Sequence, residues 1–226
     1  MSKAKRTKPE SALAGHPAGW SKINKLYSQE WRPGAHSKHF PCSAATLNRF
    51  AHRFRLAKQI GSVQLHGYQR STSAAYAATL KLFLAYSAFE MLMKVAKIPR
   101  NSIDSAYTAF RMEDRANKAA KRIGKADPGG KFLRAVKGLA GITEQNRKII
   151  DQFISGRSKK LPHTIACVRH GFVHGELAAT PAGVKPAAQK ATVTAMTDFL
   201  FNIMDTELAR RADAELDTLQ RKGSRI

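Results

Sequence analysis

Between Val168 and Leu177 the chain carries an arginine and two histidines, Arg169, His170 and His174. An arginine keeps its positive charge at any physiological pH and can hold a phosphate, whereas a histidine changes charge near neutral pH and can move a proton. These two side-chain types are the minimum set for cleaving a phosphodiester such as RNA without a metal ion. The segment is therefore the first candidate for a catalytic site.

The three side chains lie near the end of an apolar helix that we expect over 162–174. At about 100° per residue, Arg169 and His174 lie about 140° apart around the helix, whereas His170 and His174 share a face. Gly175 is typical of the residue that follows a helix, so His174 is expected at the helix end, where the dipole favours a protonated imidazole. Arg169 and His174 can then meet in two ways: His174 bends back from the helix end, or a second protomer completes the site.

The order of Arg169, a polar residue, three further residues and His174 resembles the signature of the HEPN superfamily (higher eukaryotes and prokaryotes nucleotide-binding). Many members of that superfamily are metal-independent ribonucleases. The resemblance implies two antiparallel helical protomers that bring their Arg and His residues together at a dimer interface. The family most often has Asn after the Arg, and His170 stands in that place here. A weaker likeness is the run from Tyr86 to Glu90, because family members often carry an acidic residue on an early apolar helix.

The resemblance implies a metal-independent endoribonuclease that acts as a homodimer. In that mechanism His174 takes the proton from a ribose 2′-OH, which attacks the adjacent phosphorus, and Arg169 stabilises the charge on the phosphoryl oxygens. His170 orients His174, contacts phosphate, or serves as the acid for the leaving 5′-oxygen, and Glu90 positions a catalytic group. The products are a 2′,3′-cyclic phosphate and a 5′-OH, and we expect neither a metal nor another cofactor.

Two other functional hypotheses remain for the same residues. The first is a non-enzymatic, basic helical module that binds RNA or DNA or has a regulatory role. The second is a metal-dependent hydrolase, because His170 and His174 have the spacing of helical metal ligands, with Glu176 and His163 nearby. The fixed positive charge of Arg169 disfavours a cation at that place.

The composition indicates a polyanionic partner. The chain has 39 Lys and Arg against 16 Asp and Glu, a formal net charge of +23, and residues 1–70 hold 13 of the basic residues and only 2 of the acidic ones. Such a charge attracts nucleic acid, so we expect RNA as a partner, bound with strong salt dependence. Family members often serve as toxins of toxin–antitoxin pairs or in antiviral defence, which implies an inhibitory, acidic protein partner.

The remaining composition favours a cytoplasmic protein outside the membrane. The two cysteines, Cys42 and Cys167, are far apart and fit a reducing compartment, and Cys167 among apolar neighbours is interpreted as a buried side chain rather than a nucleophile. No signal peptide is visible at the N-terminus. The most apolar stretch, from Leu80 to Val95, is interrupted by charged residues and is too short to span a bilayer.

The elements that must position these side chains are helices, because alternating apolar–polar runs are scarce. We expect an all-α, HEPN-like bundle of about six to seven helices over a single domain at 41–226, preceded by a basic, partly irregular N-terminal arm at 1–40. Glu90 is expected to pair with Lys94 one turn on, or to point into a polar cleft. The predicted helices cover 43–60, 71–97, 104–123, 131–140, 143–155, 162–174 and 187–220, with one short helix at 21–30.

Overall fold

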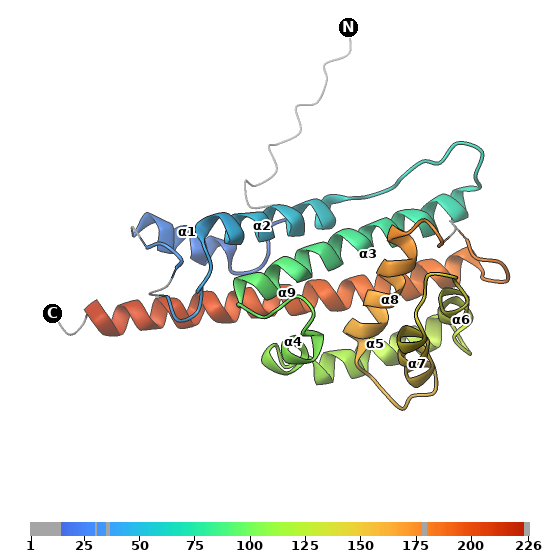
Figure 1. The fold of residues 1–226 in the computed structure, drawn as a ribbon. Coiled ribbons are helices and arrows are strands. Elements are labelled where there is room, and N and C mark those ends of the chain that lie inside the picture. Colours follow the sequence, from blue (N-terminus) through green and yellow to red (C-terminus); the bar gives the residue numbers. More distant parts are fainter. Residues whose placement is uncertain (1–14, 30, 35–36, 178–179, 224–226) are drawn as a thin grey trace, which may run out of the picture.

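The computed structural model describes residues 15–29, 31–34, 37–177 and 180–223. Over these ranges helices are the only regular secondary structure, which confirms the all-α prediction (Figure 1). The helices are α1 (Trp20–Ser28), α2 (Ala44–Gln59), α3 (Arg70–Val95), α4 (Ile103–Ala109), α5 (Glu113–Ala126), α6 (Lys131–Lys137), α7 (Glu144–Ile154), α8 (Leu161–Val173) and α9 (Pro186–Gly223).

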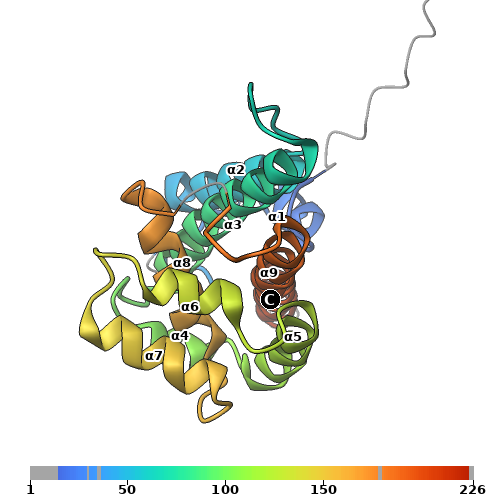
Figure 2. The same ribbon diagram turned by 90° about the vertical axis from the view of Figure 1, so that its right-hand side faces the viewer.

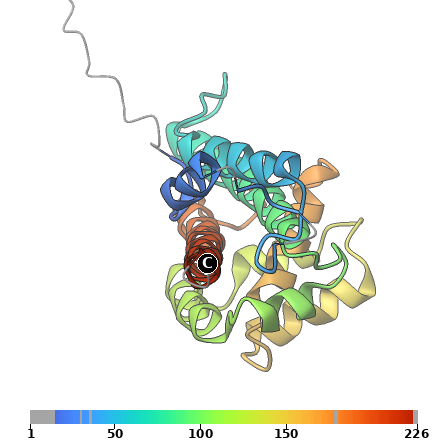
Figure 3. The ribbon, with the colours of Figure 1, turned by 90° about the vertical axis from the view of Figure 1, so that its left-hand side faces the viewer.

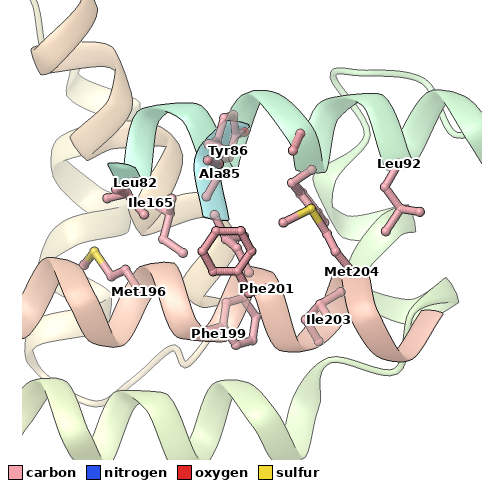
Figure 4. Packing of buried hydrophobic residues seen from close by; sticks show 14 of the residues in the cluster. Leu82, Ala85, Tyr86, Leu92, Ile165, Met196, Phe199, Phe201, Ile203 and Met204 are labelled. Atoms are coloured by element: carbon pink, nitrogen blue, oxygen red, sulfur yellow. The ribbon is translucent and has the colours of Figure 1, made fainter. Parts of the chain in front are cut away.

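The two longest helices, α3 and α9, run in the same direction and form the centre of the molecule, with α2 lying antiparallel on α3 (Figure 1). Apolar side chains of α3 such as Leu82 and Leu92 meet Met196 and Met204 of α9 in one buried core, and Ile165 of α8 joins them (Figure 4). The apolar residues of α3 surround the helix between Leu82 and Met93, so it can be covered from several sides.

The segment predicted as a basic arm at 1–40 contains α1, which packs on α9. Its residues Trp20, Ile23 and Leu26 are buried in the core. Gly19 allows the close approach: it has a positive φ of 85°, and a Cβ there would lie 2.7 Å from the Cα of Ala209. Seen along α9 from its C-terminal end, α1 (blue) and α5 (yellow-green) lie on opposite sides of α9 (Figure 3). Residues 1–14 of the predicted arm lie outside the described residues.

The described residues form nine helices rather than the six or seven expected, partly because the helix predicted over 104–123 is two helices, α4 and α5. The break falls at Arg111, whose φ of 49° is left-handed. Phe110 and Met112 on either side of it are both buried. Residues two apart on a continuous helix point about 200° away from each other, so both side chains reach the core only if the helix is interrupted.

Helix α8 lies between α3 and the helices α6 and α7, and it contacts all three (Figure 2). Its predicted range, 162–174, agrees with the observed Leu161–Val173 to within one residue. Helix α7 begins where Thr143 accepts a hydrogen bond from the backbone N–H of Asn146, and the turn before it faces the end of α8. One side of α8 therefore faces α3 and the other faces the turn between α6 and α7.

Candidate functional site

The C-terminus of α8 is closed by a glycine, as predicted. Gly175 has a φ of 71°, its N–H donates to the carbonyl of Phe172 at 3.1 Å, and the N–H of Glu176 donates to the carbonyl of Gly171 at 3.1 Å. This pair of bonds is the Schellman arrangement, which needs a left-handed residue that glycine supplies at low cost. His174 is the C-cap residue, so it occupies the helix end that the sequence predicted.

The same helix end is fastened to the turn between α6 and α7. The Nε2–H of His170 donates to the carbonyl of Gly141 at 3.0 Å, and the carboxylate of Glu176 accepts from the N–H of Gly141 at 2.8 Å. Gly171 allows the approach, because a Cβ there would lie 2.6 Å from a methyl group of Leu139. Of the roles predicted for His170, the geometry therefore supports an orienting one.

His174 is exposed and lies against His170, with 4.3 Å between the ring centroids and 50° between the ring planes. The prediction that the two histidines share a face of α8 is confirmed. This contact places His174 beside His170, and no hydrogen bond joins His174 to Arg169 within the part of the chain that the structure describes. Val173, next to His174, is 45% exposed although it is apolar.

Arg169 projects from the α3-facing side of α8. Its guanidinium carbon lies 6.0 Å from the centre of the Phe83 ring on α3, and the side chain lines a cleft of about 280 Å³. We call this the cationic cleft and define it by the residues that line it. They are Arg53 from α2, Ser87, Glu90, Met91 and Lys94 from α3, Arg100 from the segment after α3, and Arg169 from α8.

The cationic cleft brings together Arg169 and Glu90, two of the predicted site residues. Glu90 accepts two hydrogen bonds from Arg100, 2.7 Å from Nε and 3.0 Å from Nη2, and its side chain is only 13% exposed. Of the two alternatives expected for Glu90, its place in the lining of the cleft agrees with the second, whereas Arg100 replaces Lys94, the expected ion-pair partner. Helix α3 ends at Val95 and the chain then turns back. This turn places the planar guanidinium group of Arg100 opposite the carboxylate of Glu90.

The charges in the cleft do not balance. Arg53, Lys94, Arg100 and Arg169 supply four cations, and Glu90 is the single carboxylate among the lining residues. Arg53 is held by Ser87, whose hydroxyl accepts its hydrogen bond at 2.9 Å. Since Arg100 is occupied by Glu90, the field at the mouth of the cleft favours an anion with several acceptor oxygens, such as a phosphate.

Tyr86 lies beneath these charges. Burial raises the pKa of its phenol, and Glu90 raises that pKa further, whereas Arg169 and Arg100 lower it. The net direction is upward, so the phenol keeps its proton at neutral pH. Tyr86 therefore cannot serve as a base in this cleft.

The other nucleophile and ligand candidates have structural roles. Cys167 is buried, and burial raises the pKa of its thiol to about 12, so a thiolate is disfavoured, in agreement with its interpretation as a core side chain. His163 lies at the start of α8, with its Nε2 3.1 Å from Asp104. Among the described residues no group of three or more His, Cys, Asp and Glu side chains has the arrangement of a metal site.

Several residues of the cleft escaped the sequence analysis. Arg53 was visible only as one of several bases on the polar face of the helix at 43–60, and Arg100 only as a residue after a proline. The sequence signal for the partner of Glu90 was the presence of a cation shortly after the end of the predicted helix at 71–97, where Pro99 interrupts the chain. Ser87 and Phe83 carried no signal, because each is an ordinary residue of an apolar helix.

Within the described residues, no helix combines the length and the apolarity that crossing a membrane requires. No family model, no curated protein and no solved structure matches the chain.

Proposed function

We propose that the protein is a metal-independent endoribonuclease of HEPN type, active as a homodimer, that leaves 2′,3′-cyclic phosphate and 5′-OH ends. The observation that carries the proposal is the shared cleft of Arg169 and Glu90, which come from helices 79 positions apart in sequence. The family resemblance implied that both are site residues, Arg169 through the Arg–His motif and Glu90 through the acidic residue on an early apolar helix. Arg169 and Glu90 lie beside further cations that no carboxylate neutralises, and this excess positive charge is what a phosphate-binding site requires.

The exposed end of α8 supplies the second half of the proposed site. His174 takes the proton of the ribose 2′-OH as that oxygen attacks phosphorus, the P–O5′ bond breaks, and the leaving 5′-oxygen takes a proton from water to give the 5′-OH. His170, anchored on Gly141, orients His174. Arg169, together with Arg53 and Lys94, stabilises the negative charge that builds on the phosphoryl oxygens. Glu90 holds Arg100 and keeps the cations at the cleft in place.

Because Arg169 and His174 lie on different sides of α8, the proposed site is composite. Arg169 of one protomer faces His174 of its partner, and the exposed Val173 beside His174 belongs to the contact between the protomers. Two antiparallel copies of α8 related by a twofold axis give two such sites for each dimer. The net charge of +23 suits both an RNA substrate and, in a toxin or antiviral effector, an acidic inhibitory protein.

A second function, a non-enzymatic nucleic-acid-binding or regulatory module, is favoured by one observation. The separation of Arg169 from His174 leaves a single protomer with a cationic cleft but without a histidine in its lining. A module of this kind binds RNA with a steep salt dependence and cuts nothing.

The test is incubation of the purified protein with 5′-labelled total RNA in EDTA, beside His174→Ala and Arg169→Ala. We expect the wild-type protein to produce fragments with cyclic phosphate ends and each variant to be at least about 100-fold slower. Matched controls are His66→Ala and Arg157→Ala, which remove exposed side chains of the same types away from the cleft. Equal cleavage by wild type and both variants, or intact RNA with every protein, contradicts the proposal.

A further inference from the structure

A cluster of aromatic side chains adjoins the cationic cleft. Phe172 of α8 lies between Tyr76 and Phe83 of α3, with ring centroids 5.6 Å and 5.9 Å away. We call these three residues the aromatic cluster. It is joined to the cleft by Arg169, whose guanidinium lies against the Phe83 ring, and by Ser87, one helical turn after Phe83.

The aromatic cluster is not simply the edge of the core. All three side chains are only half-buried, and Phe172 is the member that packs on the core. Within the described residues, Tyr76 and Phe83 belong neither to the buried core nor to the side chains packed on it, so they rest on Phe172 and leave ring surface open to solvent. Neighbouring aromatic rings that keep open surface beside charged side chains form a contiguous apolar patch with a polar rim, a pattern typical of binding sites.

The proximity of rings and cations specifies the chemistry of the occupant. Rings stack on flat aromatic groups, and a cleft with four cations and one carboxylate holds an anion. A nucleotide carries both groups, a planar base and a phosphate, at a separation of one sugar. The cleft volume of about 280 Å³ lies near the lower end of the range for ligand pockets, which suits a phosphate and its sugar, with the base outside on the rings.

We infer that the aromatic cluster and the cationic cleft together form a binding site for an unpaired nucleotide of single-stranded RNA, with the base against Phe83 and Phe172 and its phosphate at Arg169. This inference rests on the proposed function for the choice of RNA. A base in a duplex is stacked between its neighbours and does not present its face to a side chain, whereas a base in a loop or a single strand does. The site therefore selects unpaired RNA by stacking, while its cations supply affinity for any strand.

The test measures equilibrium binding, so that it is independent of cleavage. The probe is a fluorescein-labelled, 2′-O-methyl RNA strand of mixed sequence, which lacks the nucleophilic hydroxyl, used alone and annealed to its complement. Binding is followed by anisotropy at 150 mM salt. We expect the wild-type protein to bind the single strand more tightly than the duplex. Phe83→Leu and Phe172→Leu should each weaken single-strand binding about fivefold or more, and leave duplex binding within about twofold.

Three further variants distinguish a loss of base stacking from a loss of folding and from a loss of charge as the cause of weaker RNA binding. Phe153→Leu removes a half-buried phenylalanine of α7, away from the cluster, and should bind both probes like the wild-type protein. Tyr76→Leu, in a side chain that does not pack on the core, provides a second test if Phe172→Leu unfolds. Arg169→Ala should weaken the binding of both probes and reduce the salt dependence, because it removes a phosphate contact.

Two results would overturn the inference: a wild-type protein that binds the duplex at least as tightly as the single strand, or Phe83→Leu and Tyr76→Leu proteins that retain full single-strand affinity. A change of oligomeric state in these variants, seen by light scattering with single-strand affinity unchanged, would assign the cluster to a contact between copies of the chain and also overturn it. Failure of the cleavage assay with stacking-dependent binding intact would remove the catalytic proposal alone.

Discussion

The two sides of α8 differ in how they are built. On the side that faces the turn between α6 and α7, His170 and Glu176 hold one backbone position, Gly141, through hydrogen bonds of 3.0 and 2.8 Å. On the side that faces α3, Arg169 lies in a cleft where cations outnumber the single carboxylate. On the first side, the hydrogen bonds of His170 and Glu176 are made within the chain, whereas the second side has positive charge left over for a ligand. The difference indicates that the motif combines a rigid support with a binding surface.

The largest expected effect tests whether Arg169 and His174 cooperate across a dimer. Arg169→Ala and His174→Ala proteins should each be at least about 100-fold less active in RNA cleavage. Mixed in equal amounts after dissociation and reassociation, they should recover about a quarter of the wild-type rate, because half of the dimers are mixed and each of these has one intact site of two. No recovery, with mixed dimers demonstrated by differently tagged subunits, would contradict a composite site.

The next effect concerns the balance of charge in the cleft. Glu90→Gln keeps the shape of the side chain but leaves four cations without the carboxylate between them. We expect its free energy of unfolding to fall by about 1–2 kcal/mol at low salt, and to recover partly in added salt or inorganic phosphate, as measured by urea denaturation.

A matched control for Glu90 is Asp198→Asn, which removes the carboxylate of the Arg122–Asp198 pair. Both of those side chains are about half-exposed, and they share a single hydrogen bond of 2.9 Å. The control should change stability by less than about 0.5 kcal/mol. If Glu90→Gln proves no more destabilising than the control, and insensitive to phosphate, the cleft is not the charged site described above.

A smaller effect is expected on the other side of the helix. Glu176→Ala removes the acceptor for the N–H of Gly141 and should lower the free energy of unfolding by about 1 kcal/mol. It should also raise hydrogen exchange at Gly141 and broaden the NMR signals of His174, since the turn no longer supports the end of α8. Unchanged exchange at Gly141 would show that this contact does not position the helix end.

The smallest effect is at the start of α8, where neither side of the motif is involved. Hydrogen bonds from Lys160 and from His163 hold the pKa of the Asp104 carboxyl below its usual range. A depressed pKa contributes stability that is present above the unfolded-state value, near 4, and is lost as the pH falls through the folded value. The Asp104 side chain is 64% exposed, so screening limits the contribution.

Asp104→Asn should therefore lower stability at pH 7 by less than about 0.5 kcal/mol and remove only a small part of the acid sensitivity below pH 4. Urea denaturation at pH 7 and at pH 3 measures both quantities. A loss at pH 7 as large as that of Glu90→Gln would mean that α8 depends on its start as much as on the cleft.

Local sequence signals accounted for much of the helical structure. The ranges predicted for α2, α3, α7 and α8 agree with the observed helices to within two residues, and Gly175 marked the end of α8. These signals are readable because helix periodicity, caps and glycine act within a few residues. They did not reveal the break at Arg111, because it follows from the burial of Phe110 and Met112 together.

For the candidate site, the sequence placed His170 and His174 on one face and His174 at the helix end, because both follow from the 3.6-residue repeat of a single helix. It did not predict that Arg100, rather than Lys94, would pair with Glu90, or that Arg53 and Phe83 would lie beside Arg169. Those neighbours come from three helices and the turn after α3, and long-range packing of the core sets their positions. Short-range patterns carry no information about such packing, so the cleft and the aromatic cluster could be found only in the folded chain.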